Sequence, residues 1–372
     1  MNLKIAVLPG DGIGPEVINQ AKKALNAICT VYDHQFIFED ALMGAIAIEK
    51  TGSPLPEQTL NLCLNTDAVL FGAIGDPKYD NDPEAKVRPE QGLLKLRKEL
   101  GLFANIRPIK PYSELLDSSP LKRERIEGAD FTIFRELTGG IYFGEKKLNA
   151  AGTIASDLCE YSEEEITRIA HLAFKAAQNR RNKVTLVDKA NVLETSRLWR
   201  KVVKNVSINY PDVALDFLFV DNAAMQIILN PRQFDVILTE NLFGDIISDE
   251  ASVITGSIGL LASASLGSTN ALFEPIHGSY PQATGKNIAN PFASILSAAM
   301  LLEHFGLNEE AKKVYEAVEK AIEYKVVTVD LNPDSKFGTN DIGDFISNFI
   351  LSKDDLLYFN NDNVNIGQST IV

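Results

Sequence analysis

Short apolar runs alternate with amphipathic stretches along nearly the whole chain, and this alternation constrains the fold more than any other feature of the sequence. A short apolar run bounded by turn residues is typical of a strand buried on both faces, and amphipathic helices supply the layers that cover it. The predicted strands span residues 4–8, 35–39, 68–71, 131–135, 184–187, 214–220 and 236–238. The alternation therefore predicts an α/β fold with a largely parallel sheet.

Three other segments have patterns of their own. Residues 163–178 carry apolar side chains at helical spacing, and Ser162 followed by Glu165 forms a capping-box signature at their start. Residues 137–157 combine glycines with β-formers, which predicts a hairpin arm that serves an interface. Residues 308–350 are predicted to be helical, and the tail 354–372 irregular.

Composition excludes several classes of protein. The 372 residues are 45% hydrophobic and 23% charged, which suits a globular protein of two domains or one large α/β unit. A net charge of -14 argues against nucleic acid or an anionic membrane as the main partner. The three cysteines are far apart and show no metal-ligand spacing, so free thiols in the cytoplasm are expected. No apolar run approaches the roughly 18 residues of a membrane span, and no signal peptide is visible.

The segment LKIAVLPGDGIGPEVI, residues 3–18, has the strand, glycine turn and helix order of a dinucleotide-binding loop. That loop needs glycines as G-x-G-x-x-G, whereas here the spacing is G-x-G-x-G and Pro15 occupies the third position. Proline suits the first turn of a helix. The favoured interpretation is a tight turn that borders a ligand crevice, and a Rossmann loop is the alternative.

Three aspartates form a candidate metal site. If Asn241 opens a helix, Asp245 and Asp249 lie on one face about one turn apart. Asp221 stands where a predicted strand passes into a helix. Oxygen donors without cysteine or histidine favour Mg²⁺ or Mn²⁺. The alternative is an acidic, solvated helix face, although the apolar neighbours of Asp245 make it less attractive.

Basic residues form a complementary set. Arg97 is at helical spacing from Leu93 and Leu94, Arg107 ends a strand-like run, and Arg135 follows the apolar segment FTIF. Guanidinium groups bind carboxylates in bidentate fashion, so three of them converging on one pocket would suit a dicarboxylate. Individually, each arginine is as well explained by a surface ion pair.

The remaining candidates also follow strands or lie in loops. Lys189 comes directly after a predicted strand, where it is either a base with a lowered pKa or the ion-pair partner of Asp188. Tyr142 is either a proton donor or a packed aromatic of the hairpin arm. Residues 274–291 form a loop rich in turn residues that contains His277, and they suit a ligand clamp.

Six motifs carry a resemblance across nearly the whole chain: PGDGIGPEV, RPEQGLLKLRKELGLFANIRP, RELTGGIYFGE, DKANVLE, TENLFGDIISDEAS and EPIHGSYPQATGKNIANP. In these motifs the chain resembles the isopropylmalate/isocitrate dehydrogenase family of β-decarboxylating dehydrogenases. The resemblance implies a two-domain, non-Rossmann α/β fold with central mixed sheets flanked by helices and a dimerisation β-arm. Residues 1–102 plus 256–372 would form a cofactor-binding domain, and residues 103–255 would bind substrate and metal and form the dimer.

The resemblance also implies a reaction, the NAD-dependent oxidation and decarboxylation of 3-isopropylmalate to 4-methyl-2-oxopentanoate and CO₂ in leucine biosynthesis. Lys189 would take the C2 hydroxyl proton, and Tyr142 would protonate the enol left by decarboxylation. The substrate carboxylates would be bound by Arg97, Arg107 and Arg135. One Mg²⁺ or Mn²⁺ per site would be held by Asp221, Asp245 and Asp249, and Asp221 would also contact the substrate. In the implied homodimer the active sites are shared, because Lys189, Asn191 and Asp221 come from the neighbouring subunit.

Substrate and cofactor choice follow from the same resemblance. Leu93 and Leu94 would offer an apolar pocket to an isopropyl group, and isocitrate, homoisocitrate and tartrate are the alternative substrates. The residues implied in cofactor binding are Ile13, Glu90, Asn191, Glu274, His277, Gly278, Ser279, Gln282 and Asn290. Gln282 stands where NAD-using members usually carry aspartate, yet no phosphate clamp for NADP is visible, so NAD is favoured. Asp76 replaces a common glycine without an evident reason.

Two further hypotheses come from other classes of protein. A metal-dependent hydrolase would use the aspartates to activate water, but it leaves the arginines and the His277 loop without a shared purpose. A scaffold protein without catalytic activity would tolerate the loss of Lys189 or Tyr142, whereas both residues stand in full motif context. The dehydrogenase hypothesis explains more residues with fewer assumptions.

Overall fold

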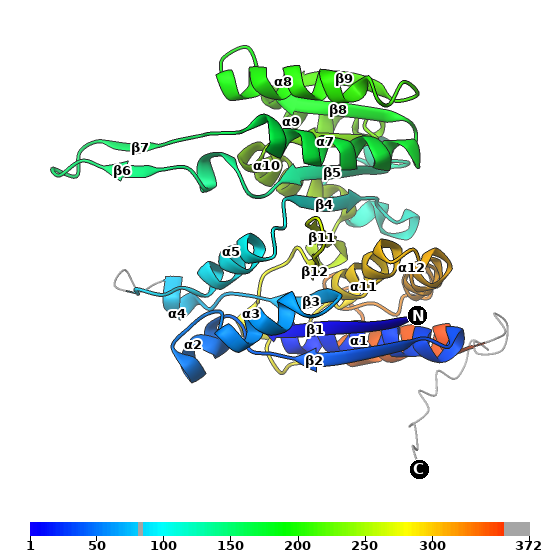
Figure 1. Ribbon diagram of the computed structural model, residues 1–372. Helices are drawn as coiled ribbons and strands as arrows, with labels where there is room; N and C mark the ends of the chain where they lie inside the picture. The colour runs from blue at the N-terminus through cyan, green and yellow to red at the C-terminus, as the bar shows by residue number, and fades with distance from the viewer. Residues whose placement is uncertain (81–84, 353–372) are drawn as a thin grey trace.

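One ten-stranded mixed sheet runs through the protein, and a separate two-stranded hairpin projects from it (Figure 1). The computed structural model describes residues 1–80 and 85–352. The strands of the large sheet lie in the spatial order β2-β1-β3-β12-β11-β4-β5-β10-β8-β9. The strand bounds are β1 (Asn2–Gly10), β2 (Gln35–Asp40), β3 (Ala68–Ala73), β4 (Ala104–Ile109), β5 (Phe131–Glu136), β6 (Lys146–Leu148), β7 (Ala155–Asp157), β8 (Lys183–Asp188), β9 (Ala214–Phe219), β10 (Val236–Thr239), β11 (Ala262–Leu266) and β12 (Ala271–Pro275).

Helices cover both faces of the sheet (Figure 1). The α-helices are α1 (Gly14–Tyr32), α2 (Ala45–Thr51), α3 (Glu57–Leu64), α4 (Pro77–Asp80), α5 (Pro89–Glu99), α6 (Arg123–Ile126), α7 (Glu163–Gln178), α8 (Glu194–Ser207), α9 (Val220–Leu229), α10 (Asn241–Ser252), α11 (Phe292–His304), α12 (Asn308–Glu323) and α13 (Thr339–Leu351). The 3₁₀ turns are η1 (Ser113–Ser118), η2 (Gly140–Tyr142), η3 (Pro231–Gln233), η4 (Val253–Thr255), η5 (Ile258–Leu260) and η6 (Pro281–Ala283). Among the described residues, no helix has both the length and the apolar character needed to cross a membrane.

In each half of the sheet, the alternation of side chains along the strands produces two hydrophobic cores, one on each face. In β1, Ile5 and Val7 pack with α1, α11, α12 and α13, whereas Ala6 and Leu8 pack against α3 and α5. In β10, Leu238 belongs to the core under α7 and α8, and Ile237 to the core under α9 and α10. The predicted burial on both faces is therefore confirmed for these interior strands, whereas the edge strands β2 and β9 contain no fully buried residue.

The middle of the sheet departs from the predicted parallel order. The pairings β12–β11, β11–β4 and β4–β5 are antiparallel, while the outer pairings are parallel. Strands β11 and β12 are absent from the predicted strands, and β4 is anticipated only as a strand-like run that ends at Arg107. Strand β11 has the sequence ASASL and lacks an apolar run. Its serines Ser263 and Ser265 are nevertheless buried, and hydrogen bonds satisfy their hydroxyl groups. Ser263 donates to Glu274 O at 3.0 Å, and Ser265 accepts from Asn105 at 3.1 Å.

Most other predicted elements are confirmed, with two boundary errors. The capping box of Ser162 and Glu165 opens α7, and β6 and β7 form the predicted hairpin arm. Val220 begins α9 rather than ending a strand. The predicted helical region 308–350 divides into α12 and α13, and Lys325 between them has a left-handed backbone that no helix continues. The predicted irregular tail lies outside the described residues.

The two halves of the sheet come from different parts of the chain. Strands β2, β1, β3, β12 and β11 come from residues 1–102 and 256–352, whereas β4, β5, β10, β8 and β9 come from residues 103–255. The halves meet at the pairing of β11 with β4. This topology is consistent with the expected division into two domains, which stays a prediction.

The glycine turn between β1 and α1 is packed against the loop before α11. The amide of Ile13 donates to Ser279 O at 2.8 Å, and a Cβ on Gly12 would fall 2.0 Å from that same carbonyl oxygen. The carboxylate of Asp11 accepts amide hydrogens from Ala45, Ile46 and Gly75 at 2.8–3.0 Å. Close backbone packing thus explains why glycines occupy these positions of the turn.

We predict that Gly12→Ala destabilises the protein more than Gly52→Ala. Both glycines have a left-handed backbone, with φ of 58° and 78°, so each alanine costs about 1–2 kcal/mol of conformational strain. Only Gly12 adds a collision with a backbone oxygen, whereas nothing lies within 4 Å of a Cβ on Gly52. Urea unfolding followed by circular dichroism measures both, and equal losses would contradict the packing argument.

Candidate active site

Two buried arginines lie on the same face of neighbouring strands. β4 and β5 pair antiparallel with Asn105 opposite Arg135, so these two side chains share a face, and Arg107, two residues from Asn105, shares it too. The side chains of Arg107 and Arg135 are only 10% and 7% exposed. Helix α10 packs over this face.

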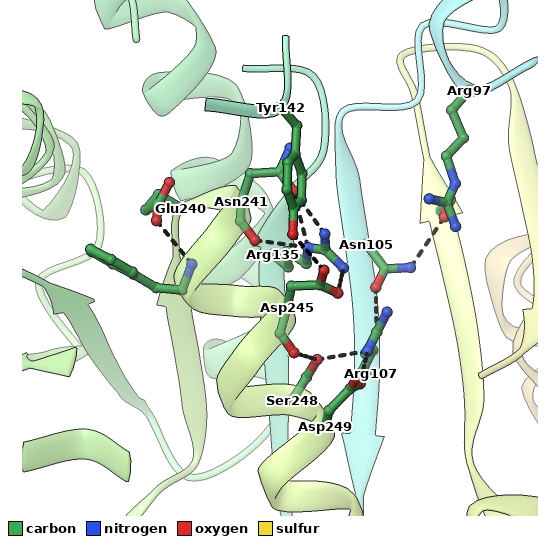
Figure 2. Close-up of polar contacts among 12 residues, drawn as sticks. Arg97, Asn105, Arg107, Arg135, Tyr142, Glu240, Asn241, Asp245, Ser248 and Asp249 are labelled. Carbon is green, nitrogen blue, oxygen red and sulfur yellow. Dashed lines mark hydrogen bonds and ion pairs between the residues drawn. The ribbon is translucent and has the colours of Figure 1, made fainter. Parts of the chain in front are cut away.

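Helix α10 supplies the acceptors for both arginines (Figure 2). Nη1 of Arg107 donates to Ser248 Oγ at 2.6 Å and to Asp249 Oδ1 at 3.0 Å. Nη1 of Arg135 donates to the Asp245 carboxylate. The predicted placement of Asp245 and Asp249 on one helix face is therefore confirmed, and each acid pairs with an arginine rather than only with solvent.

Burial determines the electrostatics of this cluster. It lowers the pKa of Arg107, and it lowers the pKa of Arg135 to about 10, with the positive charge of Arg97 adding to both effects. Both guanidinium groups nevertheless remain protonated at neutral pH. The site therefore presents desolvated positive charge, and such charge binds anions more strongly than charge in water does.

Tyr142 joins the cluster from η2, at the base of the hairpin arm. Its hydroxyl donates to Asp245 Oδ2 at 2.8 Å, and its ring lies 5.8 Å from the Arg135 guanidinium carbon (Figure 2). Burial, reinforced by the hydrogen bond to Asp245, raises the pKa of Tyr142 to about 12. The phenol therefore keeps its proton at neutral pH, as a proton donor must.

The third predicted arginine approaches from the other half of the sheet. Arg97, on α5, donates from Nη2 to Glu274 Oε1 of β12 at 2.8 Å. Its Nε is buried and has no hydrogen-bond partner among the described residues. On the same helix Leu93 packs partly into the core, and Leu94 is 47% exposed.

Lys189 and Asp221 form an ion pair, with Nζ 2.8 Å from Oδ1. The hydrogen bond from Lys189 lowers the pKa of Asp221. The alternative pairing of Lys189 with Asp188 is wrong, because the buried Asp188 carboxylate accepts from Arg200 at 2.6 Å. Asn191 lies exposed on the same loop after β8.

The three aspartates do not meet within one chain. Across residues 1–80 and 85–352, no three histidine, cysteine, aspartate or glutamate side chains gather as a metal site. Asp245 and Asp249 share the cluster with the arginines, whereas Asp221 pairs with Lys189. That all three acids share one metal site, with Asp221 from a neighbouring subunit, stays a prediction of the resemblance.

The predicted cofactor residues lie mostly on the loop before α11 and its neighbours. His277 Nδ1 is 3.0 Å from Gly278 O, while its Nε2 is buried without a partner among the described residues, and burial lowers the pKa of this histidine. Ser279 is buried beside Ile13, whereas Gly278 and Gln282 are exposed.

Two further predicted cofactor residues are anchored by the fold. Asn290 donates to Asp330 at 3.0 Å. Glu90 lies against the loop that follows β3, since a Cβ on Gly75 would fall 2.9 Å from the Oε1 atom of Glu90. Asp76, beside that glycine, accepts from the Lys78 amide at 3.0 Å, which stabilises the start of the short helix α4.

Sequence reasoning missed the polar residues that orient the arginines. Nε of Arg107 donates to Asn105 Oδ1 at 2.7 Å, and Nη2 of Arg135 donates to Asn241 Oδ1 at 2.9 Å. Ser248, the other acceptor for Arg107, is 1% exposed. The only sequence signal for these residues is a polar side chain within an apolar strand or at the start of a buried helix. Such a signal does not predict which residue the side chain will contact.

Comparison with known proteins gives consistent results. The sequence pattern of the family described as "Isocitrate/isopropylmalate dehydrogenase" matches residues 4–346. The chain is 53% identical over 352 residues to a 3-isopropylmalate dehydrogenase of Bacteroides fragilis, covering 94% of this chain and 99% of the relative. It is also 53% identical over 345 residues to the 3-isopropylmalate dehydrogenase of Bacillus subtilis, covering 91% and 94%.

Solved structures agree with the fold. An isocitrate dehydrogenase from Methylococcus capsulatus superposes with a TM-score of 0.83 at 34% identity, covering 94% of this chain and all of that one. A β-decarboxylating dehydrogenase from Thermococcus kodakarensis in its apo form gives a TM-score of 0.78 at 37% identity, covering 94% and 96%.

We predict that Asp245→Asn lowers the pKa of Tyr142 from about 12 toward its ordinary value of 10, because the variant removes the negative charge that accepts the phenol hydrogen. The fall should be partial, since burial is the larger cause. NMR titration of ¹³Cζ-labelled tyrosine, assigned with Tyr142→Phe, measures it. Asp249→Asn is the control, because Asp249 pairs with Arg107 instead. An unmoved pKa in Asp245→Asn would refute this account of the phenol.

Proposed function

Because the chain belongs to the isocitrate/isopropylmalate dehydrogenase family, we propose that it oxidises and decarboxylates 3-isopropylmalate with NAD, giving 4-methyl-2-oxopentanoate and CO₂. The relatives above 50% identity carry the name of this activity and cover nearly the whole chain. The reaction belongs to leucine biosynthesis.

The observation that carries the proposal is the cluster of Arg107 and Arg135 under the acids of α10, with Arg97 nearby. Such a cluster suits a substrate with two carboxylates, since each guanidinium binds a carboxylate in a defined geometry. Arg97 has a buried Nε without a partner among the described residues, which fits a carboxylate arriving there.

We propose that residues of α5 select the substituent carried by the substrate. Leu94 is exposed on the same helix as Arg97, and Leu93 is half-buried behind it. These apolar groups favour an isopropyl substituent over the third carboxylate of isocitrate, whose burial against leucine would leave a charge without a partner.

The donor set fits a hard divalent cation. Asp245 and Asp249 are carboxylates at one end of the arginine cluster, with side chains 35% and 71% exposed. We propose that they hold Mg²⁺ or Mn²⁺ together with Asp221 of the partner subunit. Such an ion would supply a Lewis acid beside the substrate oxygens.

The cofactor fits the loop before α11. The unpartnered buried Nε2 of His277 is the acceptor left when Nδ1 donates to Gly278 O, so it suits a donor on an adenine or ribose. Gln282 is exposed and uncharged, and we retain NAD over NADP because no basic group replaces the usual aspartate there. Bound NAD would accept the hydride from C2.

The chain's own residues would move the protons. Lys189 is proposed to take the C2 hydroxyl proton at Nζ, which Asp221 now binds at 2.8 Å. Tyr142 would give its phenol proton to the enol carbon after CO₂ leaves, and its raised pKa keeps that proton in place until then. Arginine contacts would hold the departing carboxylate in position.

A homodimer is proposed to complete each site. Lys189 and Asp221 would face the arginine cluster of the partner, because one chain does not gather them with Asp245 and Asp249. The hairpin arm exposes Leu148 and Ile154 at 67% and 69%, which suits burial by a second copy. The three free cysteines are consistent with the expected cytoplasmic location.

The expected result of the direct test is NADH formation with Mn²⁺, NAD⁺ and 3-isopropylmalate, followed at the NADH absorbance band. Isocitrate, malate and tartrate serve as parallel substrates, and NADP⁺ as the alternative cofactor. Turnover only with isocitrate or tartrate would reassign the substrate. Failure of every acid would refute the dehydrogenase proposal and favour a metal-dependent hydrolase or a scaffold.

We predict that Lys189→Met lowers kcat on the order of 100- to 10,000-fold while NAD binding persists, because the base is lost and the cofactor loop is untouched. Calorimetry with NAD⁺ checks binding. Lys183→Met is a matched control, since Lys183 forms a 2.8 Å ion pair with Asp216 at the opposite end of β8. A variant at Lys189 that retained the wild-type rate would remove this lysine from the mechanism.

A further inference from the structure

We propose that Asn241 is a positioning residue that couples Arg135 to the turn carrying Tyr142, an inference that rests on the function proposed above. Asn241 is the first residue of α10 and is only 1% exposed. Its side chain bonds to Arg135 and to Gly139, which precedes the turn carrying Tyr142. Arg135 and Tyr142 in turn both contact the Asp245 carboxylate.

The amide oxygen of Asn241 orients Arg135. Nε and Nη2 of Arg135 donate to Oδ1 at 3.1 and 2.9 Å, and Nε also donates to the Asn241 main-chain oxygen at 3.0 Å (Figure 2). These bonds take the inner edge of the guanidinium and leave Nη1 directed to Asp245. The plane of the guanidinium, and hence the direction in which it can bind a carboxylate, is fixed by Asn241.

The amide nitrogen of Asn241 reaches the catalytic turn. Nδ2 donates to Gly139 O at 3.2 Å, and Gly139 directly precedes η2, which ends at Tyr142. Only one orientation of the amide satisfies both sides, since the guanidinium is solely a donor and the carbonyl solely an acceptor. The main-chain amide of Asn241 is fixed as well, because it donates to the Tyr161 hydroxyl at 2.9 Å.

The coupling has a physical consequence for both chemical roles. Without the side-chain amide, Nη2 of Arg135 would lose its acceptor and Nε would keep only the main-chain oxygen of Asn241, so the guanidinium could rotate inside a nearly dry site. Gly139 would lose its tie to α10, so η2 could move and weaken the hydrogen bond from Tyr142 to Asp245. Substrate binding and the proton donor would therefore be disturbed together.

Asn105 provides a matched comparison within the same site. Its Oδ1 accepts a hydrogen bond from Nε of Arg107 at 2.7 Å, just as Oδ1 of Asn241 accepts from Nε of Arg135. Its Nδ2, however, donates to Ser265 Oγ in β11 at 3.1 Å and not to a catalytic turn. Asn105 is 2% exposed, so the two asparagines differ chiefly in where the amide nitrogen leads.

The experiment compares Asn241→Ala with Asn105→Ala in the full-length enzyme, with 3-isopropylmalate, NAD⁺ and Mn²⁺. We expect Asn241→Ala to raise KM for the acid and to lower kcat, each on the order of tenfold or more, because small displacements of aligned groups are costly. We expect Asn105→Ala to raise KM alone. In NMR spectra recorded at neutral pH without substrate, the ¹³Cζ resonance of Tyr142 should shift in Asn241→Ala and stay unchanged in Asn105→Ala.

Two results would overturn the coupling: an Asn241→Ala enzyme that changes only KM, or one in which the ¹³Cζ resonance of Tyr142 matches wild type. If Asn241→Ala fails to fold, as judged by the fluorescence of the single tryptophan Trp199, Asn241→Ser is used instead. Serine is too short to reach both partners, and the same criteria apply. Wild-type turnover tests the proposed function, whereas the ¹³Cζ resonance of Tyr142 without substrate tests this inference separately.

Discussion

The desolvation of Arg107 and Arg135 is the constraint on which the candidate site depends. A guanidinium that is nearly excluded from water needs a fixed acceptor for each donor edge, or the cost of burial is not offset. Helix α10 supplies these acceptors through Asn241, Asp245, Ser248 and Asp249, and strand β4 supplies Asn105. The docking of α10 over β4 and β5 is thus a condition for having positive charge at this place, and it brings Asp245 under Tyr142.

The antiparallel centre of the sheet joins the two halves that the site requires. Strand β4 carries Asn105 and Arg107 and pairs with β11, whose Ser265 accepts from Asn105. The neighbouring strand β12 carries Glu274, which holds Arg97. Hydrogen bonds therefore run from the arginine cluster into the half of the sheet that also carries the glycine turn and the His277 loop. Polar contacts link the proposed substrate and cofactor regions within a single chain.

Much of this arrangement could be predicted because strand ends and helix starts are local properties. The residues that end or follow strands, Arg135, Lys189 and Asp221, and the acid pair on α10 lie where the sequence places them. Strand β11 could not be predicted, because it is stabilised by buried serine hydrogen bonds rather than by an apolar run. The same limit hid Asn105 and Asn241, whose importance depends on distant partners.

The sequence by itself determined most of the helices and outer strands, many of the buried faces and the type of chemistry, because periodicity, capping residues and the chemical character of arginine and aspartate are properties of short segments. Tertiary structure alone decided that Lys189 pairs with Asp221 and not with Asp188, and that Asp245 serves both Arg135 and Tyr142. It also decided that the three glycines at the turn between β1 and α1 leave room for the main-chain oxygens of Ala73, Ser279 and Pro9. The physical reason is that a hydrogen bond or a close backbone contact depends on a distance, and distances between residues far apart in the chain exist only after folding.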